Sequence, residues 1–329
     1  MIERIKTGTL WLLILLSIFL TIQIWTFQPN YAILKSTEYI DNTQIGEEKK
    51  LQQVIRPKQV VVHHEGGHYF SPLDSFDFID HFFEEYSGAV LEQFILLPNI
   101  QTFSRHESGS KIEFIFPTSI PAEAIKEIFQ ISGNQVFIDS VDRIVLFLTS
   151  EQGKEQIDVK LISNDAQMVV QAQTNISVSK FKEDIQVESN DAYYKVFPYD
   201  VKLFGNGFKK TVYLPLESHY VNSVTYLAKP IPTEHFKQVL FSDPNFVKQY
   251  LQSNGEESFT DGNRMVNILQ GGNVLRYINP TIGDLIERGN KHILYSALDF
   301  LNAHGGFTNS FYYDSTKSFG STEEVIFDS

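Results

Sequence analysis

The sequence predicts an α+β protein, with one N-terminal transmembrane helix followed by two mixed domains of helices and strands. Three observations lead to this prediction. An uninterrupted apolar run lies close to the N-terminus, and helix-like and strand-like segments follow it without a regular βαβ alternation. The chain has 329 residues, of which 42% are hydrophobic and 13% aromatic, which is enough for the cores of two domains.

The transmembrane helix is predicted at Thr9–Phe27, which contains no charged residue. At about 1.5 Å per residue, this run crosses a hydrocarbon layer of about 30 Å. Trp11 and Trp25 lie near its two ends, where amphipathic rings prefer the headgroup layer. We therefore expect residues 1–27 to form a short stub and an anchor in the lipid bilayer.

The charges around the apolar run predict its orientation. Arg4 and Lys6 precede the run and no basic residue follows it closely, so the positive-inside rule places the N-terminus in the cytoplasm. A cleaved signal peptide is the alternative, but the run exceeds the usual length of about 7–15 residues and no small-x-small pair follows it. We expect a single-pass protein of the cell membrane with its bulk extracytoplasmic.

Ser17 and Thr21 are the candidate partner contacts within the membrane helix. They lie four residues apart and therefore on one face, a spacing that often marks a contact between helices. The alternative is that each hydroxyl bonds the preceding turn of its own helix. The sequence leaves both interpretations open.

Composition excludes several classes of function. The net charge of −13 disfavours nucleic acid and anionic headgroups as partners outside the membrane. The absence of cysteine excludes disulfides, thiolate metal sites and cysteine nucleophiles. The sequence also lacks a phosphate loop, a dinucleotide fingerprint and a kinase motif. We therefore expect no enzyme activity and no cofactor.

A polar tether is expected at 28–46, and it leads into an N-terminal α+β domain at 47–188. Within that domain, β-branched runs and alternation predict the strands, and three- and four-residue spacing of apolar residues predicts the helices. The expected strands are Gln59–Glu65, Val90–Leu96, Lys111–Phe116, Ile144–Leu148, Gln156–Ile162 and Gln167–Thr174, and the expected helices are Glu47–Ile55, Asp74–Tyr86, Pro121–Gln130 and Ser179–Gln186.

A second α+β domain is expected at 189–329. Gly271-Gly272 predicts a hairpin, and Gly305 is placed to end a helix. Because a domain rarely finishes on an unpaired strand, the last strand either pairs within the domain or the chain is shortened. The expected strands are Tyr193–Phe197, Lys210–Leu214, Tyr220–Ala228, Arg264–Gln270, Asn273–Ile278, Phe307–Asp314 and Glu324–Phe327, and the expected helices are Glu234–Phe241, Pro244–Leu251 and Asn290–Ala303.

One motif points to metal chemistry. His64, Glu65 and His68 form a literal H-E-x-x-H, which in zinc peptidases lies on a helix with the two histidines one turn apart. Val60–Val62 before it favour a strand and Gly66-Gly67 favour a hairpin turn, so the helical context is missing. An exported metal-dependent hydrolase is kept only as the alternative function, and no metal ligand is assigned.

Two further motifs have structural interpretations. His304-Gly305-Gly306 resembles the oxyanion loop of some esterases, but the chain has no G-x-S-x-G elbow, so we predict the end of a helix. Asp261-Gly262-Asn263 lacks the other ligands of a calcium loop and is predicted to be a turn.

Several segments taken in order carry a family resemblance. They are WTFQPNY, Ile45-Gly46-Glu47 leading into RPKQVVVHHEGGHY, LFSDPNFVKQY, SFTDGNRMV, VLRYINP and LYSALDFLNAHGGFTNSFYYD. Together they resemble the YycH (WalH) family of membrane-anchored regulators in low-GC Gram-positive bacteria. Phe307 stands where a tryptophan is expected. Members usually continue through further strands and a third domain, so the resemblance implies a truncated member with an incomplete second domain.

The resemblance also implies a function. It points to a noncatalytic regulator that modulates the sensor histidine kinase YycG (WalK) of a two-component system controlling cell-wall metabolism. A YycI-like single-pass protein is the second implied partner, and the transmembrane helices are implied contacts. A module that binds wall or lipoprotein ligands is a third hypothesis for the extracytoplasmic domains.

Overall fold

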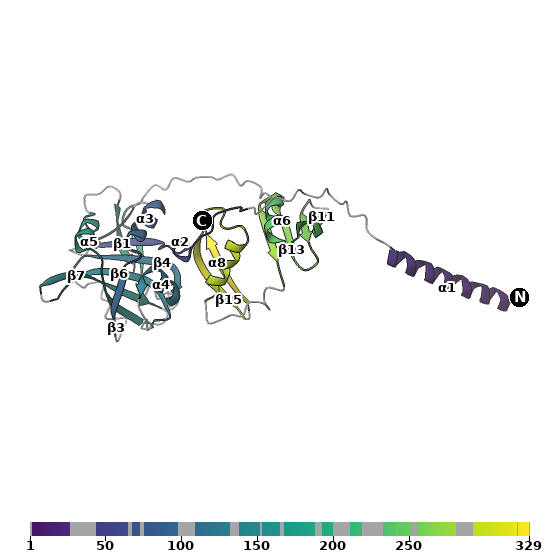
Figure 1. Ribbon diagram of the computed structural model, residues 1–329, viewed down its shortest axis with the longest axis horizontal. Coiled ribbons are helices and arrows are strands. Elements are labelled where there is room, and N and C mark those ends of the chain that lie inside the picture. The colour runs from purple at the N-terminus through teal and green to yellow at the C-terminus, as the bar shows by residue number, and fades with distance from the viewer. Residues whose placement is uncertain are drawn as a thin grey trace. The chain divides into compact units, whose positions relative to one another are not determined.

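The computed structural model divides the chain into two units (Figure 1). One unit contains Gln44–Tyr226 and Glu287–Ser329, and the other contains Met1–Thr43 and Leu227–Ile286. The tether predicted at 28–46 lies mostly outside the described residues, and the strand predicted at Tyr220–Ala228 lies wholly outside them. The structure describes residues 2–26, 44–64, 68–72, 76–97, 109–131, 138–151, 153–164, 168–187, 193–199, 211–218, 233–241, 243–251, 255–280, 292–320 and 322–328.

Helix α1 (Ile2–Thr26) begins seven residues before Thr9 and contains the predicted membrane segment up to Thr26, while Phe27 lies outside the described residues. Within the described part of the chain, it is the one helix long and apolar enough to cross a membrane. The leucine, isoleucine and tryptophan side chains described between Ile5 and Leu20 are exposed, as in Trp11 and Leu15. An apolar helix with no protein core around it suits a lipid environment.

A ten-stranded sheet forms the frame of the larger unit. Its order is β10-β9-β2-β1-β4-β6-β7-β8-β3-β5, and every pairing is antiparallel except that of β3 with β5. The predicted meander of three strands is confirmed as β6-β7-β8. The strands are β1 (Gln59–His64), β2 (His68–Pro72), β3 (Val90–Leu97), β4 (Lys111–Pro121), β5 (Gln130–Ile131), β6 (Ser140–Glu151), β7 (Lys154–Ser163), β8 (Met168–Thr174), β9 (Tyr193–Tyr199) and β10 (Val212–Pro215).

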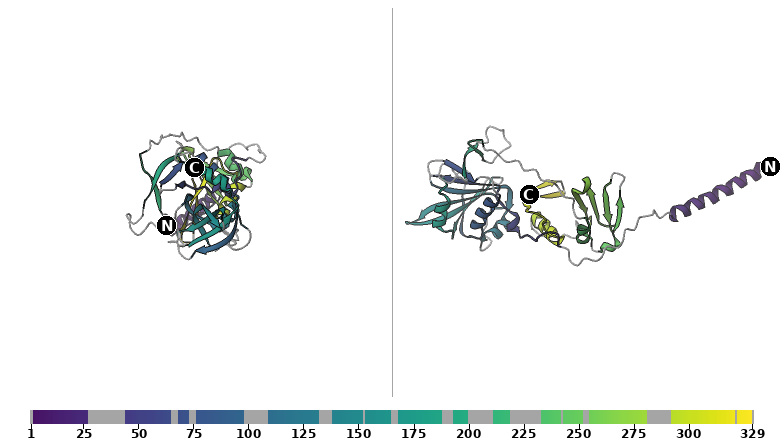
Figure 2. Two further views of the ribbon diagram at one scale, coloured as in Figure 1. Left: turned by 90° about the vertical axis from the view of Figure 1, so that its left-hand side faces the viewer. Right: turned by 90° about the horizontal axis from the view of Figure 1, so that it is seen from above.

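One face of this sheet carries the main core. Val60 and Val62 of β1 point to it, while Val61 belongs to the opposite face, as the two-residue period of a strand requires. The five helices described in this unit each contribute buried side chains to this core. They are α2 (Leu51–Val54), α3 (Phe76–Tyr86), α4 (Ala122–Ile128), α5 (Val178–Asp184) and α8 (Ile293–Ala303). Figure 2 shows the ribbon from two further sides.

The opposite face is closed at one end by the sheet itself. In the strand order, β10 lies four positions from β4, about 19 Å away in a flat sheet. Yet the Tyr213 hydroxyl of β10 lies 2.8 Å from Glu113 of β4. The sheet therefore curls, and Tyr213 packs with Val61 and Val196 inside the curl.

The C-terminal segment also belongs to this unit. Strands β15 (Tyr312–Phe319) and β16 (Thr322–Asp328) form an antiparallel hairpin, so the last strand is paired. Leu294 and Leu298 of α8, with Phe307 and Tyr313, are buried in the main core.

This grouping differs from the predicted boundary at residue 189. Strand β9 pairs with β2, which brings Tyr193–Tyr199 into the first sheet. The segment that includes α8 and β15 then returns to the first core. Local sequence patterns do not predict this contact between α8, β15 and the first core, because the residues that meet are far apart in sequence.

The other unit contains a separate four-stranded sheet in the order β11-β12-β13-β14. The helix α6 (Thr233–Leu240) shares its core through Leu240, which packs with Phe259 and Val266. The predicted Gly271-Gly272 hairpin is confirmed between β13 and β14. The strands are β11 (Lys248–Leu251), β12 (Glu257–Thr260), β13 (Met265–Leu269) and β14 (Val274–Ile278).

The helix predicted at Pro244–Leu251 is wrong. The Asp243 side chain caps only a single 3-10 turn, η3 (Pro244–Phe246). Val247 is already extended, and the following residues pair with β12 as strand β11. Proline at the first position correctly predicted a helical start, but cross-strand pairing overrides the weak helical preference of the next turn.

Candidate functional site: a backbone clasp and a buried charged network

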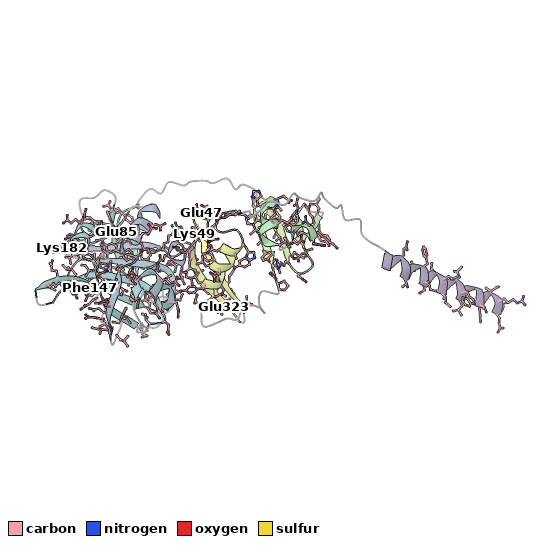
Figure 3. All side chains as sticks on the ribbon, in the orientation of Figure 1. Glu47, Lys49, Glu85, Phe147, Lys182 and Glu323 are labelled. Atoms are coloured by element: carbon pink, nitrogen blue, oxygen red, sulfur yellow. The ribbon has the colours of Figure 1, made fainter. Side chains whose placement is uncertain are left out.

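Two segments about 250 residues apart meet in what we call the clasp, made of residues 45–49 and 302–307. The Ile45 and Gly46 amides both donate to the Gly305 carbonyl, at 3.1 and 2.7 Å. The Glu47 amide donates to the Phe307 carbonyl at 3.0 Å, and the Phe307 amide returns a bond to Glu47 at 2.8 Å. Figure 3 shows Glu47 and Lys49 beside the α8–β15 segment.

The Asn302 side chain extends this pairing by one residue. Its Oδ1 accepts from the Lys49 amide at 3.0 Å, and its Nδ2 donates to the Lys49 carbonyl at 2.8 Å. One amide side chain thus satisfies both backbone groups of Lys49, as a neighbouring strand would.

Two glycines allow the backbones of the clasp to approach. A Cβ on Gly46 would lie 2.0 Å from the Phe307 carbonyl oxygen. A Cβ on Gly306, whose φ is +79°, would lie 2.6 Å from the Glu47 carbonyl oxygen. Neither contact is sterically tolerable, so both positions require glycine. The predicted role of Gly305 after the helix end is confirmed by its φ of 98°, but the close approach at Gly306 was not predicted.

A cluster of cations and aromatic rings flanks the clasp. The Lys49 ammonium lies 5.4 Å from the Phe307 ring centroid and 5.2 Å from that of Tyr312. Burial lowers the pKa of Lys49, although the nearby Asp80 carboxylate acts in the opposite direction. The Arg56 guanidinium lies 3.5 Å from the Tyr312 centroid, and the Tyr312 hydroxyl donates to Asp80 at 2.7 Å. These contacts join the first residues of the unit to its last hairpin.

The second candidate is a buried charged network inside the curl of the sheet. Glu113 of β4 lies 2.8 Å from His63 Nε2 and 2.5 Å from Arg143 Nη1. Tyr213 donates its hydroxyl to the same carboxylate at 2.8 Å. Arg143 also donates to the Thr211 carbonyl, so the guanidinium connects β6 to the start of β10. Strands β1, β6 and β10 are thereby tied to one carboxylate of β4.

The carboxylate of Glu113 stays ionised. Burial alone would raise its pKa, but the Arg143 guanidinium and the bonds from His63 and Tyr213 lower the pKa to about 2. Burial, followed by the charge of Glu113, raises the pKa of Tyr213, which therefore stays neutral. A carboxylate that is ionised and fully buried at neutral pH accepts hydrogen bonds and does not supply a proton. The network is suited to holding strands together.

The two histidines of the H-E-x-x-H motif lie on two paired antiparallel strands, as the glycines predicted. His64 of β1 stands opposite His68 of β2 across the antiparallel pair, and Glu65 lies outside the described residues. His63 is engaged by Glu113. The histidine geometry of a helical zinc site is thus absent from this hairpin. In the part of the chain that the structure describes, no group of three histidine, aspartate or glutamate residues could hold a metal ion.

The remaining motif residues have local partners. His304 follows the end of α8, where its Nδ1 lies 2.7 Å from the Phe300 carbonyl, in agreement with the predicted helix end. In α1, the Thr21 hydroxyl donates to the Ser17 carbonyl at 2.9 Å. Both Ser17 and Thr21 remain on the exposed surface of the helix. The hydroxyl oxygen of Thr21 can still accept a hydrogen bond from a neighbouring helix.

Comparison with known proteins identifies the chain at the level of its family. The family model described as YycH protein, N-terminal domain, matches residues 3–191, and that described as YycH protein, C-terminal domain, matches residues 209–329. The chain belongs to the YycH family. The segments that form the clasp lie one in each matched region, so the clasp joins the YycH N-terminal and C-terminal parts.

Two YycH proteins illustrate the relationship. The chain is 24% identical over 326 residues to the two-component system WalR/WalK regulatory protein YycH of Bacillus subtilis (strain 168). The match covers 88% of this chain and 66% of that protein, so the chain spans just under two thirds of the relative's length. The crystal structure of YycH from Bacillus subtilis superposes with a TM-score of 0.65 at 16% identity, covering 83% of this chain and 70% of that one. The two proteins share a fold.

Proposed function

We propose that this chain is a noncatalytic, membrane-anchored regulator that modulates a sensor histidine kinase of a two-component system controlling cell-wall metabolism. The observation that carries the proposal is the match of both YycH family models, together with the Bacillus subtilis relative, which is named a WalR/WalK regulatory protein. The implied partners are the kinase YycG (WalK) and a YycI-like single-pass protein.

The anchor supports this proposal because a kinase regulator must reach the kinase in the plane of the membrane. Helix α1 is long and apolar enough to span a bilayer, and Arg4 and Lys6 at its start favour a cytoplasmic N-terminus. The larger unit then lies on the extracytoplasmic side. The clasp begins at residue 45, within the last residues of the tether predicted at 28–46, so a force transmitted along that segment would reach the larger unit at the clasp.

The test is co-purification of the kinase with the full chain from detergent-solubilised membranes. We expect the kinase to be retained by the full chain and by residues 1–43 fused to an unrelated soluble protein. A control fusion carries an unrelated membrane helix of the same length. Loss of the kinase from both the full chain and the native fusion would overturn the proposal.

We also propose that Ser17 and Thr21 form the helix face that meets the partner. At about 100° per residue, Phe19 lies on the opposite face of α1. Ser17→Leu and Thr21→Leu are expected to weaken retention of the kinase severalfold, since interhelical contacts of this kind are worth about 0.6–2 kcal/mol. Phe19→Leu is the matched control and should leave retention unchanged. Equal retention in all three variants would remove these residues from the contact.

A further inference from the structure

A cavity of about 350 Å³ lies beside the buried network, where β1 begins, β4 bulges and β10 starts. Its apolar wall includes Ile79, Ile115 and Phe116. Ser71 and Tyr194 add a hydroxyl and a phenol to the lining. The volume is at the lower end of the range of about 300–1,000 Å³ that small-molecule sites occupy, and the mixture of apolar wall and few polar groups is typical of them.

The charged side chains that line the cavity, among the residues that the structure describes, are both basic. Lys58 and Arg143 line it, and among the described residues no carboxylate does. This is unusual for a chain whose net charge is −13. Glu113 neutralises much of the charge of Arg143. Lys58 is exposed, so its charge can reach a ligand, and it also lines a neighbouring cavity that contains Asp314 and Asp328.

We propose that this cavity binds a small molecule with one carboxylate and an apolar body. The apolar body would fill the space between Ile115, Phe116 and Ile79. The carboxylate would lie toward Lys58, within the positive field to which Arg143 contributes. The proposal concerns the larger unit alone and does not depend on association with a kinase.

The test uses para-fluorophenylacetate and fluorine NMR, with the full chain in nanodiscs of neutral phosphatidylcholine. Empty nanodiscs measure partition into lipid, which is subtracted. We expect saturable binding of para-fluorophenylacetate and at least fivefold weaker binding of the neutral para-fluorophenylacetamide. Equal or tighter binding of the amide, or of para-fluorophenethylamine, would overturn the charge assignment.

Three variants locate the site. Val212→Trp places a bulky ring at an exposed position of the lining and should abolish saturable binding. The melting temperature of this variant should stay unchanged, which would show that the fold is kept. Lys58→Glu should weaken binding about fivefold, because it replaces attraction at the surface with repulsion. Lys154→Glu makes the same charge change at an exposed strand position away from the lining and should have no effect. Absence of saturable binding in the unaltered chain, or equal binding by Val212→Trp, overturns the proposal.

Discussion

The clasp and the buried network both tie distant parts of the larger unit together, but they do so by different physics. The network gathers His63, Arg143 and Tyr213 around the fully buried carboxylate of Glu113. The clasp relies on backbone hydrogen bonds that only two glycines allow. The network therefore depends on charge balance, and the clasp depends on the absence of side-chain atoms.

This difference determines which changes break the network and which break the clasp. A buried ion pair contributes little net free energy when intact but is costly when one partner is removed. The clasp is half-buried, so its polar groups can recover hydrogen bonds from water when it opens. We expect the network to break together with the fold and the clasp to open locally.

Arg143→Met is expected to have the largest effect. It leaves the Glu113 carboxylate buried without its cation, at a cost of about 3–5 kcal/mol in the free energy of unfolding. Hydrogen exchange of the β4 and β6 amides in the full chain measures this loss. The double variant Arg143→Met with Glu113→Gln removes both charges and should recover part of the protection. If the loss of protection in the double variant equals the sum of the losses in Arg143→Met and Glu113→Gln, the network does not depend on charge balance.

Acid should act on the network before it acts on the clasp. The pKa of Glu113 is about 2 in the folded chain against an ordinary value of 4.5, so the folded state binds its proton less readily than the unfolded state. The resulting stabilisation, about 3–4 kcal/mol at about 1.4 kcal/mol per pKa unit, is complete above pH 4.5 and is lost as the pH falls toward 2.

Hydrogen exchange of the β4 amides between pH 4.5 and 2 measures this loss. Glu113→Gln cannot ionise, so its protection should be lower at neutral pH but should change less over that interval. An identical acid dependence in the variant and the unaltered chain would assign the acid sensitivity to other carboxylates.

Gly306→Ala should open the clasp at a cost of about 2–3 kcal/mol, from left-handed strain of about 1–2 kcal/mol and the clash with Glu47. Gly88→Ala is the matched control, because Gly88 has nearly the same φ, +80°, and no atom within 4 Å of an added Cβ. Hydrogen exchange at the Glu47 and Phe307 amides should increase only in Gly306→Ala. An equal loss of stability in Gly306→Ala and Gly88→Ala would show that backbone strain explains the whole effect and that the close contact with Glu47 contributes nothing.

The two junctions also differ in how far the sequence predicts them. The β-branched run Val60–Val62 and the glycines after it correctly predicted the hairpin that holds His63. The partners Glu113 and Arg143 could not be assigned, because each occupies an alternating strand position that the pattern alone would allow to face water. Likewise, Gly305 was recognised as a helix end, while the contact of Gly306 with Glu47 depends on two segments about 250 residues apart. The ordered family segments contained both halves of the clasp without showing that they touch.

Asn302→Ala should have the smallest effect and should sharpen the distinction most. It removes two hydrogen bonds to the Lys49 backbone, which at about 0.5–1 kcal/mol each amounts to a loss of about 1–2 kcal/mol. Exchange at the Lys49 amide should increase, while the β4 and β6 amides around Glu113 should stay protected. Asn302→Asp keeps the acceptor for the Lys49 amide but places a carboxylate oxygen against the Lys49 carbonyl, so exchange at the Lys49 amide should increase in this variant too. If exchange in β4 increases as much as at Lys49, the clasp and the network unfold as one cooperative element. If it does not, the point where the tether enters the larger unit can open while the sheet behind it remains folded.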